Sequence, residues 1–103
     1  MYNLIYITTK DIAEARKIAN YLVRQRLVAC CNIIPKIESI YHWKNKTEKA
    51  SESAMFCKTK KSLVFKVIKE IKKMHSYDVP CVVSLEIKEG DKDFLNWILK
   101  ETK

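Results

Sequence analysis

The sequence predicts a single α+β domain, residues 1–103, in which helices cover one face of an antiparallel sheet. Segments with strand and helix character follow one another in the order β-α-β-β-α-β, with a further helix at the end. This order is typical of the split βαβ sandwich. The chain is 103 residues long and 48% hydrophobic, which is enough for one modest core and too little for two.

The first half of the chain combines a strand, a helix and a long apolar segment. Residues 2–8, YNLIYIT, are rich in β-branched and aromatic residues, as in a strand. Thr9 or Asp11 can cap the helix that follows, and Glu14 has the capping-box spacing from Asp11. Apolar residues then repeat at helical spacing, and the basic residues Arg24 and Arg26 predict the end of the helix there.

The segment Leu27–Trp43 is the centre of the predicted sheet. Its first part, VACCNII, is apolar without alternation, which indicates a strand buried on both faces. Pro35 cannot donate to a sheet ladder, so we expect a bend or bulge there and a change of strand partner beyond it. Alternation predicts Val28, Cys30 and Ile34 on one face, and Ala29, Cys31 and Ile33 on the other.

Two helices on one face of a sheet cover only one of these apolar sets. The other set would form an exposed apolar patch larger than monomeric proteins normally tolerate. The pattern therefore predicts that another copy of the same chain covers it, and that the protein is an oligomer.

The second half repeats the strand-helix-strand pattern. The polar run KNKTEKASE predicts a hairpin loop, and residues 53–59 predict the third strand. Residues 60–74 show the clearest helical periodicity in the chain. Residues 75–80 form a connection, because residues before a proline avoid helical geometry. A fourth strand over 80–87 and a short helix ending near Lys100 complete the order.

Composition excludes several classes of function. Gly90 is the only glycine, so neither a P-loop nor a glycine-rich dinucleotide fingerprint is present. The net charge of +8 comes from lysines spread along helix faces, which favours a solvated surface over a specific nucleic-acid site. No apolar run is long enough to span a membrane, and the N-terminus lacks a signal-peptide pattern, so we expect a cytoplasmic protein.

Four cysteines, Cys30, Cys31, Cys57 and Cys81, lie in apolar strand-like runs without a C-x-x-C pair. They are interpreted as buried, reduced thiols, which fits a cytoplasmic address. Cys30 and Cys31 are neighbours in a strand and point to opposite faces, so they cannot share a metal ion within one chain. Neither histidine has a ligand partner at a suitable spacing, which leaves open only a metal site shared between subunits.

Three further segments have both a structural and a functional interpretation. His75 either caps the second helix or contributes to a binding loop, as polar residues on a rigid scaffold often do. Residues 41–43 either pack in the sheet or form a ligand platform, and Lys58 is either solvated or holds an anion. Tyr77 and Asp78 beside His75 do not make an active site without a nucleophile or cofactor, so no enzymatic activity is predicted.

A set of motifs then points to a known family. In chain order these are Ala29-Cys30-x-Asn32-Ile33, Ser39-Ile40-Tyr41-x-Trp43, Lys58-Thr59, His75-x-Tyr77-x-Val79-Pro80 and a late Trp97. Together they resemble the CutA family of divalent-cation tolerance proteins, over about residues 6–98. Asn45 stands where the family usually has glycine, and asparagine also tolerates left-handed geometry.

The resemblance implies a ferredoxin-like homotrimer, similar in architecture to the PII signalling proteins, with strands that extend across subunit boundaries. It implies a role in tolerance of copper or other divalent metal ions, without a required cofactor. By matching position, the resemblance implies metal contact for Cys30 and His75. It places four further residues around a cleft between subunits: Trp43, Glu52, Lys58 and Tyr77.

The sequence thus leaves two hypotheses for function. The first is a trimeric, cytoplasmic protein that binds copper or other divalent metal ions through the soft and borderline ligands Cys30 and His75. The alternative is a PII-like scaffold that binds a small anionic metabolite in the cleft through Lys58.

Overall fold

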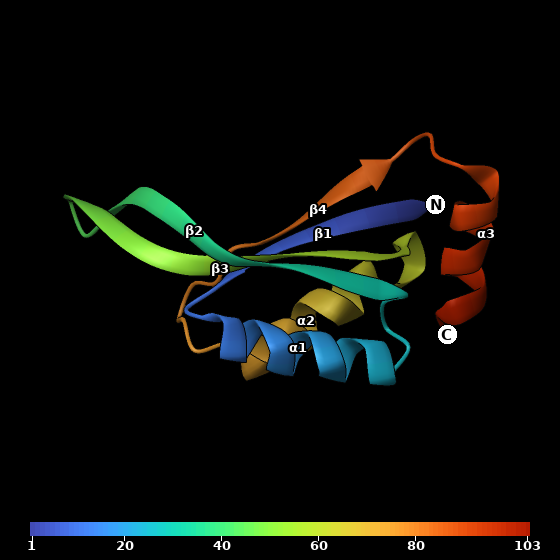
Figure 1. The fold of residues 1–103 in the computed structure, drawn as a ribbon, viewed down its shortest axis with the longest axis horizontal. Coiled ribbons are helices and arrows are strands. Elements are labelled where there is room, and N and C mark those ends of the chain that lie inside the picture. Colours follow the sequence, from blue (N-terminus) through green and yellow to red (C-terminus); the bar gives the residue numbers. More distant parts are fainter.

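Four strands and three α-helices make up the chain, in a computed structural model that describes residues 1–103 (Figure 1). The sheet is antiparallel throughout and has the strand order β2-β3-β1-β4, which confirms the predicted fold class. The elements are β1 (Tyr2–Thr9), α1 (Ile12–Arg24), β2 (Cys30–Trp43), β3 (Lys46–Lys60), α2 (Val64–Met74), β4 (Val82–Ile87) and α3 (Lys92–Glu101).

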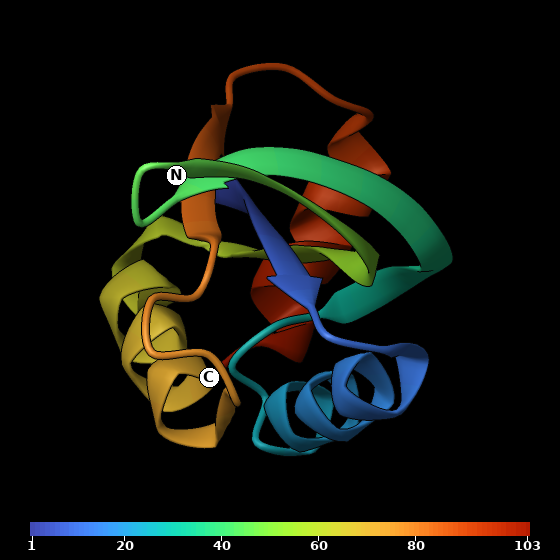
Figure 2. The same ribbon diagram turned by 90° about the vertical axis from the view of Figure 1, so that its left-hand side faces the viewer.

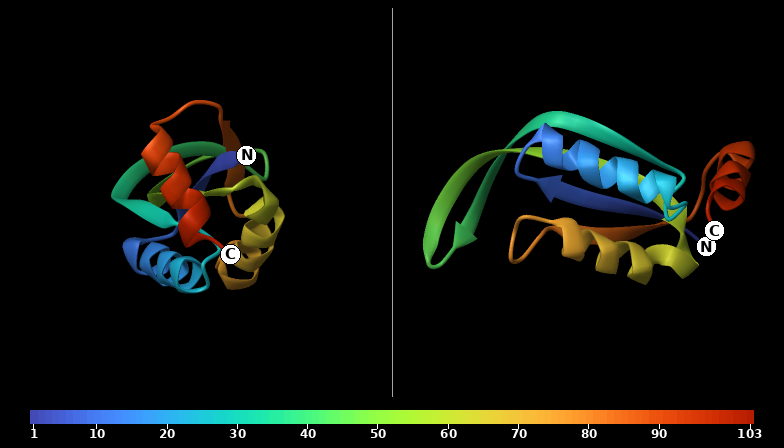
Figure 3. Two further views of the ribbon diagram at one scale, coloured as in Figure 1. Left: turned by 90° about the vertical axis from the view of Figure 1, so that its right-hand side faces the viewer. Right: turned by 90° about the horizontal axis from the view of Figure 1, so that it is seen from below.

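The two longer helices form one layer. Helices α1 and α2 lie side by side on the same face of the sheet (Figure 2). Helix α3 instead lies across the end of the sheet near the N-terminus, so it leaves the opposite sheet face uncovered (Figure 3). None of the helices has the length and hydrophobicity that a membrane-spanning helix requires.

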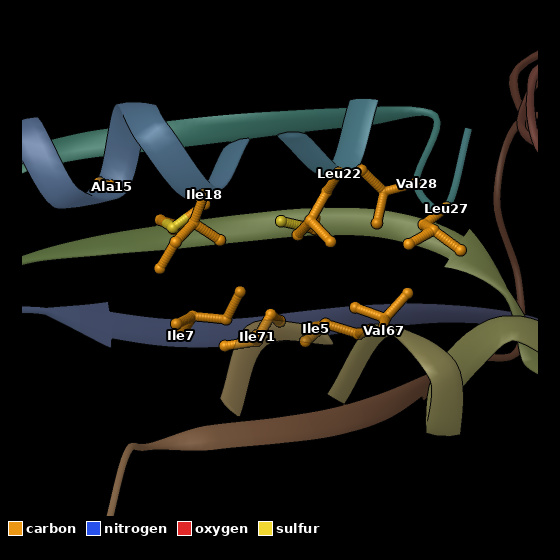
Figure 4. Packing of buried hydrophobic residues seen from close by; sticks show 11 residues of the cluster. Ile5, Ile7, Ala15, Ile18, Leu22, Leu27, Val28, Val67 and Ile71 are labelled. Carbon is orange, nitrogen blue, oxygen red and sulfur yellow. The ribbon is translucent and has the colours of Figure 1, made fainter. Parts of the chain in front are cut away.

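The core lies between β1, β3 and the two helices, where apolar side chains interdigitate (Figure 4). Strand β1 contributes Ile5 and Ile7, which are fully buried. Each fully buried aliphatic side chain of this kind stabilises the folded state by roughly 1.5–3 kcal/mol relative to an exposed one. The helices add one apolar stripe each, consisting of Ala15, Ile18 and Leu22 from α1 and Val67 and Ile71 from α2.

Both ends of α1 follow from local sequence. The Asp11 carboxylate accepts a hydrogen bond of 2.9 Å from the backbone N–H of Glu14, which confirms Asp11 as the N-cap. At the other end, Arg26 has a left-handed φ of 54°. The N–H groups of Arg26 and Leu27 bond to the carbonyls of Val23 and Leu22, which is the Schellman pattern.

The turn between β2 and β3 is much tighter than the sequence predicts. The prediction of a hairpin loop over 44–52 is wrong, because β3 already begins at Lys46 and pairs with Trp43. The loop is only Lys44-Asn45, with φ values of 50° and 65°, as a two-residue type I′ turn requires. The strand carries no apolar signal at its start because both of its faces are solvent-exposed there.

Pro35 forms the expected bulge. The β2–β3 register shifts between Ile34 and Ile37, and the Ser53 hydroxyl donates a 2.6 Å hydrogen bond to the Pro35 carbonyl. The predicted change of strand partner does not occur within the chain, because β2 pairs with β3 on both sides of the bulge. Proline has no N–H to donate, and the bulge leaves this position unpaired, so the ladder continues on both sides of it.

The predicted strand faces also need one correction. Val28 belongs to the core together with Cys31 and Ile33, whereas Cys30 and Ile34 lie on the opposite face. Strand β2 begins only at Cys30, so strict alternation does not extend back to Val28. The predicted start of β4 also needs correction, because the strand begins at Val82 and not at residue 80.

Candidate functional site

A cavity of about 490 Å³ opens on the sheet face away from α1 and α2. Its floor includes Tyr6 and Thr8, which alternate along β1 with the core residues Ile5 and Ile7 and therefore point to the uncovered face. The volume lies in the range of small-ligand sites. The cavity is lined by Tyr6, Thr8, Ser39, Tyr41, Trp43, Glu52, Tyr77, Asp78, Val79 and Cys81.

Three parts of the chain enclose this cavity. One wall is the β2–β3 hairpin, where Ser39, Tyr41 and Trp43 succeed one another at the two-residue spacing of a strand face. The second is the loop between α2 and β4, which extends to Cys81, and the third is β1, which contributes Tyr6 and Thr8. Four of the ten lining residues are aromatic, and the polar groups beside them can orient a ligand.

The charge of the cavity is opposite to the charge of the protein. Glu52 and Asp78 line it, and no lysine, arginine or histidine does. The chain as a whole has 20 lysines and arginines against 12 acidic residues. Because opposite charges attract most strongly in a concave, partly desolvated site, this cavity favours cations over anions.

Glu52 is the most enclosed charged group of the cavity. It is 9% exposed, and its Oε2 accepts a hydrogen bond of 2.6 Å from the Tyr77 hydroxyl. Its Oε1 makes no hydrogen bond within the chain. Burial and the bond to Glu52 raise the pKa of Tyr77 well above its usual range, and burial with nearby Cys81 and Glu52 raises that of Tyr6.

The loop that carries Tyr77 is tied to α1 through Glu14. The Glu14 carboxylate accepts hydrogen bonds from the backbone N–H of Lys10 at 3.0 Å and of Ser76 at 2.8 Å. Burial alone raises the pKa of Glu14, but these hydrogen bonds outweigh it and hold the pKa below its usual value. A carboxylate at the N-terminus of a helix is also stabilised by the helix dipole.

His75 anchors the same loop to β1. Its Nδ1 accepts a 3.1 Å hydrogen bond from the Tyr77 N–H, so its Nε2 carries the proton and donates to the Thr8 carbonyl at 2.7 Å. His75 does cap α2, but through its backbone N–H, which donates to the Ile71 carbonyl at 2.9 Å, whereas its ring bonds to β1. Both ring nitrogens are engaged, so metal contact by His75 requires that one of these bonds opens.

Cys30 lies far from His75 within one chain. It begins β2 and pairs with Lys58, which is opposite Leu4 on β1, whereas His75 bonds to Thr8 on the same strand. Four residues along a strand correspond to about 13 Å. Burial raises the pKa of the Cys30 thiol, although Lys58 opposes this, and a protonated thiol is a weak metal ligand.

The cleft residues predicted from the sequence separate into two groups. Trp43, Glu52 and Tyr77 line the cavity together, whereas Lys58 does not and instead bonds to the Asn32 side chain. Tyr6 and Thr8 were not predicted as cavity residues. Their alternation with the core residues along β1 was the signal that could have identified them. Nothing in the sequence pattern marks Cys81 as a cavity residue.

No cluster of three or more His, Cys, Asp or Glu side chains within the chain is arranged to hold a metal ion. The donors of the cavity, Glu52, Asp78 and Cys81, nevertheless suit divalent cations in type, because carboxylates bind hard ions and a thiol binds softer ones. Cys30 and His75 do not form a joint site within one chain.

Comparison with known proteins identifies the family that has this architecture. Residues 3–101 match the family model described as CutA1 divalent ion tolerance protein. The chain belongs to the CutA family. The divalent-cation tolerance protein CutA of Archaeoglobus fulgidus is 45% identical over 98 residues, which cover 95% of each chain. Its solved structure, described as that of a periplasmic divalent cation tolerance protein, superimposes with a TM-score of 0.97 over 100% of both chains.

Other CutA proteins extend the comparison. The CutA of Thermus thermophilus is 36% identical over 102 residues, or 99% of each chain, and its structure gives a TM-score of 0.97. The chloroplastic CutA of Arabidopsis thaliana is 36% identical over 97% of this chain, which spans 55% of that relative's length. The likeness thus covers the whole fold, including the hairpin and the loop that enclose the cavity.

Proposed function

We propose that this CutA family member binds divalent cations, copper among them, in the cavity at Glu52, and that it contributes in this way to metal tolerance. The observation that carries the proposal is the cavity's charge: it has two carboxylates and no basic residue, in a chain of net charge +8. The names of the relatives from A. fulgidus and T. thermophilus, divalent-cation tolerance protein, agree with this choice. The function is one of binding and requires no catalytic group.

Glu52 would be the principal ligand. Its Oε2 is held by the Tyr77 hydroxyl, which leaves Oε1 to coordinate a cation. Asp78 adds a second negative charge to the same cavity and Cys81 also lines it, but the two are not arranged with Glu52 as a three-ligand cluster. The remaining ligands would be water or side chains of a second copy.

A homotrimer is part of the proposal. Strand β1 pairs with β3 only from Ser53 to Lys60, so the hairpin beyond Pro35 is a two-stranded ribbon that projects from the sheet (Figure 1). Such a ribbon is marginally stable by itself. It exposes Ile40, and the uncovered sheet face exposes Leu85, which is 53% accessible. Packing the ribbon on a neighbour's sheet would cover both, and would complete the cavity that the ribbon borders.

The ligand pair implied by the family resemblance, Cys30 and His75, stays a prediction for a site shared between subunits. Cys30 on one chain and His75 on another could meet there only if the His75 ring gives up a hydrogen bond. The geometry does not favour the anionic metabolite, because Lys58 lies outside the cavity and carboxylates line it.

Equilibrium dialysis against copper(II) and against a hard ion such as manganese(II) tests the proposal. Glu52→Gln keeps the shape and an acceptor for Tyr77 but removes the charge, and should weaken binding by about tenfold or more. Glu48→Gln, on the same hairpin but outside the cavity, is the matched control and should bind like the wild type. Equal affinity of Glu52→Gln and the wild type would overturn the proposal.

Three further variants separate competing sites. Cys30→Ala and His75→Ala test the pair implied by the resemblance, and unchanged affinity in both rejects that pair. His42→Ala removes an exposed imidazole that can bind copper nonspecifically. Loss of all binding in His42→Ala alone would assign the bound copper to the hairpin surface and not to the cavity.

We also place the protein in the cytoplasm. The A. fulgidus relative is described as periplasmic and the A. thaliana relative as chloroplastic, so location varies within the family. Fractionation of the source cells, with detection of the native protein, decides the compartment. Recovery outside the cytoplasmic fraction would contradict this placement and would leave the cavity proposal unaffected.

A further inference from the structure

Two cysteines face each other on the core side of the sheet. Cys31 on β2 is directly opposite Cys57 on β3, and their Sγ atoms are 2.7 Å apart. That is closer than two sulfur atoms that share no bond normally approach. We propose that Cys31 and Cys57 are a disulfide-forming pair, which locks β2 to β3 when the protein meets an oxidising environment.

The strand geometry permits this bond without a rearrangement of the backbone. Residues directly opposite in an antiparallel pair have Cα atoms about 4.5–5.5 Å apart, and disulfides span Cα separations of about 4.4–6.8 Å. The two residues are 26 positions apart in sequence, yet their side chains point to the same sheet face. Only a small side-chain adjustment is needed to bring the sulfur atoms to bonding distance.

The other two cysteines do not compete for this bond. Cys30 is the immediate neighbour of Cys31 in β2, so its side chain points to the opposite face. Cys81 lines the cavity beside Glu52, also on the uncovered face. The sheet itself therefore separates the Cys31–Cys57 pair from both remaining thiols.

Exposure assigns the two sulfurs different roles in the reaction. Cys57 is 0% exposed, and contact with Cys31 together with burial raises its pKa, so it stays a neutral thiol. Cys31 is only partly buried and is the one that a small oxidant reaches. With oxidised glutathione, the Cys31 thiolate attacks one glutathione sulfur, forms a mixed disulfide and releases one glutathione.

The second step closes the pair. The Cys57 sulfur attacks the Cys31 sulfur of the mixed disulfide, and its proton passes to the departing glutathione thiolate, which leaves as the second glutathione. In total two protein S–H bonds become one S–S bond, and the two electrons and two protons reduce one glutathione disulfide to two thiols. The bond would join β2 and β3 on the N-terminal side of the Pro35 bulge.

The test uses a double variant that keeps only the proposed pair. Cys30→Ser/Cys81→Ser is unfolded, refolded in a mixture of reduced and oxidised glutathione, which leaves unpaired thiols largely free, and then alkylated with iodoacetamide under denaturing conditions. Refolding removes any limit set by the burial of Cys57. We expect neither an alkyl group nor a bound glutathione on the refolded chain, and two alkyl groups after prior reduction, as intact mass reports. The oxidised form should also melt at a higher temperature, by roughly 10 °C.

The wild type and single variants decide which sulfurs react. The wild-type chain has four cysteines and should retain two alkylation sites after the same treatment. Cys31→Ser should retain all three of its thiols, whereas Cys30→Ser should retain one. Two alkyl groups on the oxidised double variant, or a disulfide that persists in Cys31→Ser, would overturn the proposal. A bond found only between chains, as a dimer on a nonreducing gel, would also overturn it.

Discussion

The Tyr77 hydroxyl donates a 2.6 Å hydrogen bond to Glu52 Oε2, joining the loop after α2 to the middle of β3. The two residues are 25 positions apart, and the bond spans one side of the cavity. It satisfies a carboxylate that is 9% exposed. Burial of such a group is costly without a partner, so this bond both stabilises the fold and positions the charge of the cavity.

Replacing Tyr77 with phenylalanine should lower the free energy of unfolding by about 1–3 kcal/mol, because Glu52 loses its hydrogen-bond donor. Urea denaturation at a fixed protein concentration measures the change. Tyr41→Phe is the matched control, since the Tyr41 side chain lines the same cavity without a hydrogen bond of its own. Equal losses in the two variants would show that the Glu52 contact contributes nothing.

Alkaline pH should weaken the contribution of Tyr77 to stability. Its pKa is raised in the folded state, so above about pH 10 the unfolded chain releases this proton first. The stabilisation is thus fully present below about pH 10 and is lost as the pH rises further. The stability difference between the wild type and Tyr77→Phe should be constant up to about pH 10 and should shrink above it in urea titrations. A constant difference would contradict the assignment.

The contribution of Glu14 to stability should be lost at low pH, whereas that of Tyr77 is lost at high pH. Its pKa is lowered by hydrogen bonds from the Lys10 and Ser76 backbone, which outweigh the effect of burial. Its contribution is present above about pH 4.3 and is lost as the pH falls through the lowered folded-state value. Glu14→Gln should cost about 1–3 kcal/mol at neutral pH and less in acid, measured by urea denaturation.

The control for the Glu14 variant is an exposed carboxylate that makes no hydrogen bond. Glu38→Gln on β2 should change the free energy of unfolding by less than about 0.5 kcal/mol at either pH. If Glu14→Gln also behaves like this control, the tie between the loop and α1 does not stabilise the fold.

Assembly should depend on the uncovered sheet face. Leu85→Glu places a charge in the surface that we propose a neighbouring chain covers, and it should produce monomers at micromolar concentration in analytical ultracentrifugation. Phe65→Glu is the control, because Phe65 is 87% exposed on α2, in the helical layer. The wild type and Phe65→Glu should both sediment as trimers. A wild-type monomer would contradict the proposed assembly.

Local signals in the sequence identified most of the fold. The helical spacing of Ile18 and Leu22 and the cap at Asp11 predicted α1, and Pro35 predicted the bulge. The first residues of β3 escaped prediction because they are exposed on both faces, so no periodicity of two marks them. Their strand geometry comes from pairing with β2 across the turn at Asn45.

The site was less accessible to sequence reasoning. Trp43, Glu52 and Tyr77 line one cavity within the chain, and their place in a cleft between subunits stays a prediction, but Lys58 lies six residues from Glu52 along β3, about 20 Å away. The ring of His75 bonds to Thr8, a contact between residues 67 positions apart that no local pattern encodes. Distance along β3 therefore excludes Lys58 from the cavity, and a contact between distant segments fixes the His75 ring.

Anomalous diffraction from crystals soaked in copper(II) tests the cavity most directly. The central claim predicts a peak at about 2.0–2.2 Å from the Glu52 carboxylate, in the cavity that Trp43 and Tyr77 line, and its loss in Glu52→Gln crystals. A peak found only at Cys30 or at the exposed His42, with the cavity empty, would contradict it.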